Sequence, residues 1–165
     1  MIKEIILASK SEVRKKILEK NGISCMVKPS YVDEDEIKKS LIKEGALPVD
    51  ISKSLAELKS NKISFKYIDD IVLGADSVID LNGEIISKPK DRNQALEILK
   101  KLNGKKHQLI SSVCISKNGN MIWNVTDQAN LTMKRMTENE LQTYLNKIGD
   151  KELYAYNVYQ IEGEG

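Results

Sequence analysis

One carboxylate and one lysine, at the two ends of a predicted hairpin, are the residues of this chain best placed to do chemistry. Asp76 follows a short apolar run and Gly74, a residue type that lets the backbone come close to whatever lies above the sheet edge. Sheets of α/β proteins usually bind ligands at such an edge, so the carboxylate can serve there as a metal ligand or a general base. Asn82-Gly83 between apolar residues predicts a tight turn that folds Lys88 back toward the level of Asp76. A solvated ion pair would use the same two residues, and the pattern alone leaves both interpretations open.

A second candidate site lies where the first predicted strand, residues 2–7, leads into a predicted helix at residues 12–20. Ser11 is a suitable N-cap for this helix, and the unpaired backbone N–H groups of a helix N-terminus attract anions. Arg14, one turn into the helix, would add a positive charge. The junction could therefore hold a phosphate, although an ordinary capped helix with a solvated basic face explains the same residues.

The remaining elements alternate between strands and helices before a long antiparallel pair. Apolar periodicity predicts further strands at 25–28, 71–88 (with the hairpin), 108–116 and 121–133, helices at 48–61, 91–102 and 137–147, a helix that begins in the acidic run 32–36, and a strand-like tail from 154. This order predicts an α/β fold: a single domain with one mixed, twisted sheet, flanking helices and a central cleft as the binding site.

Composition narrows the class of protein. The 165 residues suffice for one domain with a sizeable core, and 41% hydrophobic with 30% charged residues fit a globular protein. The 26 basic and 24 acidic residues give a net charge of +2, which argues against a partner as acidic as nucleic acid. No apolar run reaches the length of a membrane span and no signal peptide opens the chain, so a cytoplasmic protein is expected.

Cysteine and aromatic residues exclude two further classes of site. Cys25 and Cys114 lie far apart in apolar runs and the chain has a single histidine, so reduced core cysteines are expected and a zinc site is not. An RNA-binding surface would need exposed aromatic residues among basic ones. Trp123 lies in an apolar strand, where a core position is the prediction.

Seven ordered motifs between residues 2 and 165 resemble those of the Maf family of nucleoside triphosphate pyrophosphatases. The matching stretches are Leu7-Ala8-Ser9-Lys10-Ser11 with Arg14, Val32-Asp33-Glu34, Leu55-Ala56-Glu57-Leu58-Lys59, Gly74-Ala75-Asp76, Gly83-Glu84-Ile85-Ile86-Ser87-Lys88-Pro89, Leu102-Asn103-Gly104-Lys105-Lys106-His107 and Tyr159-Gln160-Ile161-Glu162-Gly163. The resemblance implies one Maf/ITPase-like domain over residues 1–165. It implies a cytoplasmic hydrolase of acid anhydrides that cleaves a nucleoside triphosphate to the monophosphate and pyrophosphate, as part of nucleotide-pool house-cleaning.

The resemblance also implies a cofactor and partners. Cleavage of a triphosphate calls for a divalent cation on the phosphate oxygens, and an all-carboxylate ligand set suits magnesium or manganese. The expected partner is the nucleoside triphosphate itself, with no nucleic acid and no membrane. The oligomeric state stays open, with a homodimer as one option. The family is also described as septum formation inhibitor proteins, which leaves an alternative: a nucleotide-binding regulator of cell division without significant catalysis.

Carried over residue by residue, the resemblance implies that Asp76 is the general base or a metal-linked carboxylate and that Glu34 is a second metal ligand. Asp33 or Asp35 could take the place of Glu34. The residues implied to bind phosphate are Ser9, Ser11, Arg14, Lys59 and Lys88, the two lysines also being counted as catalytic.

Three departures from the family pattern fall in the implied base pocket. Val13 stands where the family has the first of two arginines, Ser77 where relatives carry Thr or Gln, and Glu162 where many carry Gln. An ionised carboxylate at 162 can accept two hydrogen bonds from the N1–H and amino group of guanine, so guanine nucleotides are expected to be preferred over uridine ones. The family pattern also continues past residue 165 into another strand and a Gly-Leu-Pro segment, so the chain is expected to lack that part.

Overall fold

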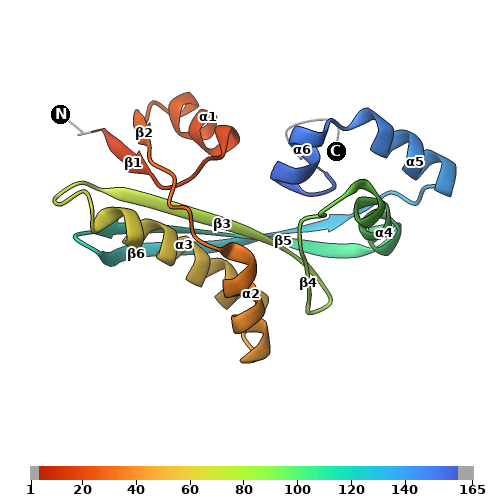
Figure 1. Cartoon of the computed structure of the whole chain (residues 1–165), viewed down its shortest axis with the longest axis horizontal. Helices are drawn as coiled ribbons and strands as arrows, with labels where there is room; N and C mark the ends of the chain where they lie inside the picture. The colour runs from red at the N-terminus through yellow and green to blue at the C-terminus, as the bar shows by residue number, and fades with distance from the viewer. Residues whose placement is uncertain (1–3, 160–165) are drawn as a thin grey trace. The chain divides into compact units, whose positions relative to one another are not determined.

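The computed structural model describes residues 4–159, which form helices and one mixed sheet (Figure 1). The strands are β1 (Ile5–Leu7), β2 (Cys25–Val27), β3 (Val72–Leu81), β4 (Glu84–Ile86), β5 (Lys106–Lys117) and β6 (Asn120–Thr132). The helices are α1 (Glu12–Lys20), α2 (Glu34–Lys43), α3 (Pro48–Ser64), α4 (Arg92–Leu102), α5 (Glu138–Lys147) and α6 (Asp150–Tyr156). The strand order is β2-β1-β3-β5-β6, with β4 paired to β3. The predicted mixed α/β class is confirmed.

Parallel pairing of the first strands places two candidate segments side by side. β1 pairs in parallel with both β2 and β3, and Leu7 lies opposite Leu73. The backbone N–H of Ala8 donates to the carbonyl of Leu73 at 2.8 Å, so the loop after β1 starts beside the Gly74–Asp76 stretch of β3. The carboxyl ends of parallel strands meet at one edge of a sheet, and here that edge receives the residues predicted to bind an anion.

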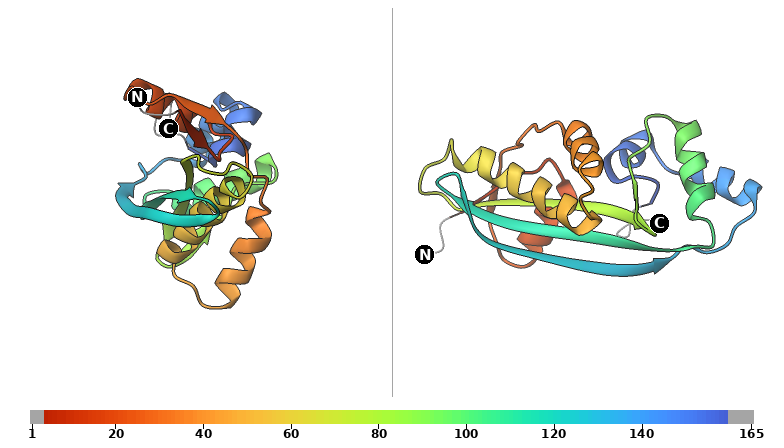
Figure 2. Two further views of the ribbon diagram at one scale, coloured as in Figure 1. Left: turned by 90° about the vertical axis from the view of Figure 1, so that its left-hand side faces the viewer. Right: turned by 90° about the horizontal axis from the view of Figure 1, so that it is seen from below.

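Helix α3 packs closely along one face of β3 and β5 (Figure 2), and a glycine makes this possible. A Cβ added at Gly74 would clash with the backbone carbonyl of Ala56 and lie 2.7 Å from the backbone nitrogen of Ser60. Hydroxyl groups of α3 also bond to the sheet. Ser52 Oγ donates to the carbonyl of Asp76 on β3, and Ser60 Oγ lies 2.7 Å from Ser116 Oγ on β5. The sequence predicted that the backbone at Gly74 lies close to another group, and in the structure that group is helix α3.

The chain divides into two compact units. The first comprises residues 1–78 and 110–128, and the second residues 79–109 and 129–165. In the first unit Ile6, Ala8, Ile63 and Val72 form a small apolar cluster. In the second, buried residues of β3, β4 and α4 to α6 and the segment after α6 form a larger one: Ile79, Leu81, Ile86, Ala95, Leu99, Leu102, Leu141, Leu145, Leu153 and Val158.

Local signals in the sequence were reliable where a single turn or cap decides the structure. The side chains of Ser11, Asp91 and Thr137 cap α1, α4 and α5. Asn82 and Gly83 both have positive φ, 54° and 91°, as a two-residue hairpin turn requires. Cys25 and Cys114 are buried free thiols, as predicted. None of the described helices has the length and apolar character needed to cross a bilayer.

Three predictions about the elements are wrong. Asp76 lies within β3 and not at its end, because the strand continues to Leu81. The tail predicted as a strand from 154 starts inside helix α6, whose Leu153 is fully buried in the second unit's core. Trp123 is 50% exposed, because it lies on β6, the last strand in the order, where most side chains face outward.

Candidate active site

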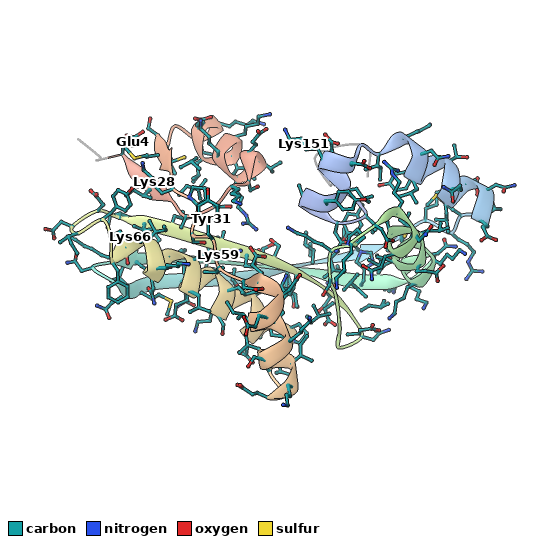
Figure 3. The ribbon with its side chains drawn as sticks, in the orientation of Figure 1. Glu4, Lys28, Tyr31, Lys59, Lys66 and Lys151 are labelled. Atoms are coloured by element: carbon teal, nitrogen blue, oxygen red, sulfur yellow. The ribbon has the colours of Figure 1, made fainter. Side chains whose placement is uncertain are left out.

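A buried lysine between two carboxylates forms the centre of the candidate site. Lys59 Nζ lies 2.7 Å from Asp76 Oδ1 and 2.8 Å from Glu34 Oε1. Asp76 is 3% exposed and Lys59 5% exposed, whereas the Glu34 side chain is 34% exposed. Charged groups at this depth are rarely retained without partners, because burial of an unpaired charge is very costly. These three residues, predicted from separate motifs, meet in one cluster within the first unit. Figure 3 marks the position of Lys59 on α3.

The local structure explains why these side chains meet. Asp76 alternates with Ala75 and Ser77 along β3, and Ser52 on α3 donates to its backbone carbonyl at 3.1 Å. Lys59 precedes Ser60, the residue that packs against Gly74, so the same close approach that fixes α3 on β3 brings Lys59 to Asp76. Tight backbone packing thus sets the position of a charged pair.

The acidic run before α2 resolves into separate roles. Asp33 is the N-cap, because its Oδ1 accepts the backbone N–H of Glu36 at 3.0 Å. Asp35 is exposed. Glu34 instead turns to Lys59 and lies 3.9 Å from Lys38, one turn along α2. Of the three acids left open by the sequence, the structure joins Glu34 to the cluster.

One oxygen of the cluster has no protein partner. Asp76 Oδ2 is buried and accepts no hydrogen bond from any described residue. Buried carboxylate oxygens are nearly always satisfied, so an orphaned one beside a second carboxylate suits a bound cation or water. The described residues contain no group of three or more Asp, Glu, His or Cys side chains arranged around a metal position. A cation would therefore be held by one or two carboxylates, as magnesium commonly is when substrate phosphates complete its shell.

The loop before α1 joins the same edge of β3. Arg14 Nη1 donates to the carbonyl of Ala75 at 2.8 Å and to Ser9 Oγ at 3.2 Å. Ser9 is buried, and its Oγ also accepts the backbone N–H of Ser11. Ser11 Oγ in turn accepts the N–H of Arg14 as the N-cap of α1. The guanidinium thus rests on the residue that precedes Asp76, which brings the predicted anion site and the carboxylate cluster together.

Comparisons with known proteins show the family of this chain. Residues 4–165 match the family described as Maf-like protein. This chain belongs to the Maf-like protein family. It is 72% identical over 165 residues to the nucleoside triphosphate pyrophosphatase of Pelagibacter ubique, covering 100% of this chain and 85% of that protein.

More distant members carry two different names. A nucleoside triphosphate pyrophosphatase of Ruegeria sp. is 40% identical over 165 residues, which is 100% of this Maf-like chain and 83% of that protein. A 7-methyl-GTP pyrophosphatase of Rhizobium meliloti is 32% identical over 161 residues, which is 98% of this chain and 81% of that protein.

The four remaining residues predicted for the site have the following positions. Lys88 lies after β4 in the second unit and is exposed. Ser77 Oγ lies 2.8 Å from Ser111 Oγ on the neighbouring strand. Val13 is half-buried on α1, and Glu162 lies outside the described residues. Their roles in this Maf-like protein stay predictions.

Sequence reasoning missed two residues that support the cluster. Lys38 is 9% exposed and adds a second cation beside Glu34, and the spacing of four residues between them on one helix was the available signal. Ser52 belongs to a series of small residues four apart on α3, with Ala56, Ser60 and Ser64, all of them buried. That spacing marks a helix face suited to close packing.

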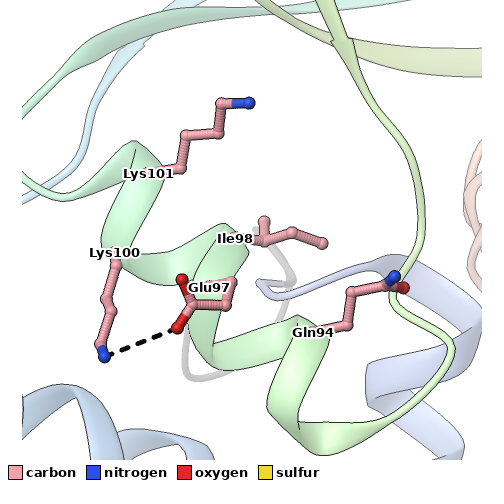
Figure 4. Close-up of a pocket in the computed structure, with 5 residues that line it drawn as sticks. All are labelled: Gln94, Glu97, Ile98, Lys100 and Lys101. Carbon is pink, nitrogen blue, oxygen red and sulfur yellow. Dashed lines mark ion pairs between the residues drawn. The ribbon is translucent and has the colours of Figure 1, made fainter.

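A shallow hollow on the surface of the second unit is not part of this site. It is lined by side chains of α4 alone: Gln94, Glu97, Ile98, Lys100 and Lys101 (Figure 4). Lys100 pairs with Glu97 at 3.5 Å, and none of the predicted site residues lines the hollow. Its charged groups therefore belong to the solvated face of α4.

Proposed function

We propose that this Maf-like protein hydrolyses a nucleoside triphosphate to the nucleoside monophosphate and pyrophosphate. The observation that carries the proposal is the buried Asp76 carboxylate, which is paired with Lys59 through Oδ1 and has its other oxygen without a protein partner. The second oxygen, Oδ2, is therefore able to bind a cation or a water. The names of relatives that are 72% and 40% identical agree with this activity.

Asp76 and Glu34 are the residues that would hold a divalent cation, magnesium or manganese. Both are carboxylates linked by Lys59, and hard cations prefer oxygen ligands. When bound, such a cation neutralises charge on the phosphate oxygens and makes a bound water more acidic. Lys59 holds the two carboxylates in one fixed arrangement, which reduces the reorganisation needed when substrate arrives.

The chain's own groups also supply what the reaction needs at the phosphates and the water. Arg14, fixed by Ser9 and Ala75, offers a cation and hydrogen-bond donors to the triphosphate. One water oxygen bonds to phosphorus, the bond to the bridging oxygen breaks, and pyrophosphate leaves. Asp76 accepts the proton that the water loses, which makes it the general base of the proposal. Lys88 is assigned to the departing phosphates on the family pattern.

The base is the less defined part of the substrate. We assign Ser77, Val13 and Glu162 to the base pocket, with guanine favoured because a carboxylate at 162 accepts from both N1–H and the amino group. Val13 has no flat face on which a cationic 7-methylguanine could stack, so ordinary guanine nucleotides are preferred in the proposal. The comparison of kcat/KM for GTP and UTP in wild type and Glu162→Gln tests this part. An unchanged ratio would remove Glu162 from base recognition.

A second candidate function is a regulator that binds nucleotide without turning it over. Such a protein needs cations for the phosphates, but it has no need of a buried carboxylate placed to accept a proton from water. The orphaned Asp76 Oδ2 therefore favours the enzyme.

Product analysis decides between the two functions. The wild-type protein is incubated with magnesium or manganese and a panel of common and modified nucleoside triphosphates, and products are separated by anion exchange. Monophosphate and pyrophosphate in equal amounts, formed only with the divalent ion, are expected. Diphosphate with orthophosphate, or binding without turnover across the panel, would contradict the proposal.

A further inference from the structure

Tyr31, in the loop between β2 and α2, has a backbone and an exposure that packing does not explain. Its φ is 48°, in the left-handed region that bulky residues rarely adopt, and its side chain is 71% exposed. A non-glycine residue in this region is strained and persists where the surroundings enforce it, often at functional sites. An exposed ring brings no burial to offset that strain. Its contacts are therefore the place to look for a role.

Two lysines from different elements contact Tyr31. Lys10 Nζ lies over the ring, 4.3 Å from its centroid, and Lys62 Nζ donates to the Tyr31 carbonyl at 3.0 Å. Lys10 comes from the loop that carries Ser9 and Ser11, and Lys62 from α3, one turn beyond Lys59. Tyr31 itself precedes Glu34 by three residues. The contacts thus tie together the three segments that build the candidate site, all within the first unit.

The cations already described in this unit's site use some or all of their donors on protein groups. Lys59 is shared by Asp76 and Glu34, and the Arg14 guanidinium is held by Ser9 and the Ala75 carbonyl. A nucleoside triphosphate carries several negative charges that need further cations. Lys10 differs from these residues because its described contact is with the face of a ring. An ammonium has three donors, and one that rests on an aromatic face keeps donors for an anion on its other side.

The loop that carries Ser9 gives a further reason to expect an anion near Lys10. Lys10 lies in the same loop, one residue before the Ser11 N-cap of α1. The unpaired N–H groups at that end of the helix already favour an anion.

We propose that Lys10 is an additional phosphate-binding residue of the site and that Tyr31 is the residue that positions its ammonium. The proposal rests on the proposed function, since it names a group that binds the triphosphate of that same substrate. The strained backbone of Tyr31 places its ring under the Lys10 ammonium, beside the loop that carries Ser9 and Ser11.

Equilibrium binding tests the role of Lys10 without requiring turnover. Dissociation constants for α,β-methylene-GTP and for GMP are measured in wild type, Lys10→Met and the matched control Lys16→Met, an exposed lysine on α1. Lys10→Met should weaken binding of the triphosphate analogue by about tenfold, leave GMP binding within about twofold, and reduce the salt dependence of triphosphate binding, as loss of one phosphate contact does. If Lys10→Met and Lys16→Met change the dissociation constant of the triphosphate analogue equally, the proposal is overturned.

Variants of Tyr31 separate positioning from general stability. Tyr31→Phe keeps the ring and should bind the analogue as wild type does, whereas Tyr31→Leu should weaken binding, with no further loss when combined with Lys10→Met. Tyr31→Gly relieves the strain, so it should raise or preserve Tm while weakening binding. Asp69→Gly, at φ 65° in a loop that bonds to Asn118, is the control for relief of strain and should leave binding unchanged; it also removes the exposed ion pair between Asp69 and Lys117. Tyr31→Leu with wild-type affinity would overturn the positioning role. Wild type that binds the analogue but never releases pyrophosphate would refute the proposed function alone, because these binding constants would still test Lys10.

Discussion

Both compact units bury apolar residues, but they differ in their buried polar side chains. In the described part of the first unit the buried residues include Lys38, Lys59 and Asp76, together with the hydroxyls of Ser9, Ser30, Ser52, Ser60, Ser64, Ser112 and Ser116. In the described part of the second, the buried polar side chains are His107 and Asn157, and a cluster of ten buried apolar residues forms the core.

This difference indicates that the buried polar groups serve the chemistry more than the stability of the fold. An apolar core stabilises by removing surface from water and tolerates changes of detail. Buried ions and hydroxyls give little net stability, but they fix side chains in one arrangement, as preorganised sites require. Substitutions at the buried ions and hydroxyls of the first unit are therefore expected to act mainly on activity, and substitutions in the second unit's apolar core mainly on stability.

Neutralising Asp76 should give the largest effect on activity. Asp76→Asn keeps the shape of the side chain but removes the charge that holds a cation or accepts a proton, so kcat should fall by about a hundredfold or more. Circular dichroism should show the fold retained. Asp80→Asn, on the same strand but bonded to the hairpin turn at Gly83, is the matched control and should keep kcat near wild type. An Asp76→Asn enzyme with near wild-type kcat would break the assignment of chemistry to the first unit.

Truncating one leucine in each unit should sharpen the comparison. Leu99 and Leu55 are both fully buried, on α4 and α3 respectively. Each Leu→Ala change should lower the free energy of unfolding by about 2–5 kcal/mol, through lost transfer energy and the cavity left behind. Leu99→Ala should keep kcat below its new Tm, whereas Leu55→Ala should also lower kcat, since α3 carries Lys59. The comparison fails if both variants lose activity equally at temperatures where both are folded, as followed by urea unfolding and steady-state kinetics.

Adding a methyl group at Gly74 should link packing to activity. Gly74→Ala forces α3 away from β3, because the new Cβ meets backbone atoms of Ala56 and Ser60 that cannot turn aside. Overpacking of this kind costs about 1–3 kcal/mol, and the shift should lower kcat/KM about tenfold by moving Lys59 from Asp76. Gly149→Ala is the control, because its Cβ would meet only the flexible end of the Glu152 side chain. Similar kinetics in the two variants would show that α3 does not set the Lys59 position.

The smallest expected effect concerns the single histidine, in the second unit. Burial lowers the pKa of His107 below its usual 6.5, and its Nε2 lies 3.0 Å from the hydroxyl of Tyr159. As pH falls below 6.5 the unfolded chain takes up a proton that the folded chain resists, so the free energy of unfolding decreases in that range. An NMR titration gives the imidazole pKa directly, because the chain has one histidine. Urea unfolding between pH 5 and 7 should show a weaker pH dependence in His107→Gln than in wild type, while a folded-state pKa above 6.5 would reverse the sign.

The sequence predicted what depends on short patterns or on whole motifs. The caps at Ser11 and Thr137 and the turn at Asn82-Gly83 follow from local backbone chemistry, and the structure has all of them. Asp76, Lys59 and Glu34 were proposed together from the ordered motifs, and they do meet.

Features that depend on distant partners could not be read from the sequence. Trp123 has an apolar neighbourhood in the chain, but its exposure follows from the place of β6 at the end of the strand order. The start of the tail was assigned to a strand because nothing in its pattern reveals that Leu153 packs into a core built from α4 and α5. The contact between Lys10 and Tyr31 joins residues twenty-one positions apart, and neither carries a local signal for the other.

The central claim is that Asp76 is where a divalent cation and the triphosphate meet. Electron paramagnetic resonance of Mn²⁺, titrated into the protein with α,β-methylene-GTP present, measures this without turnover. Wild type and Asp80→Asn should bind the ion in the presence of the analogue, and Asp76→Asn should lose that binding. Unchanged Mn²⁺ binding in folded Asp76→Asn would contradict the claim.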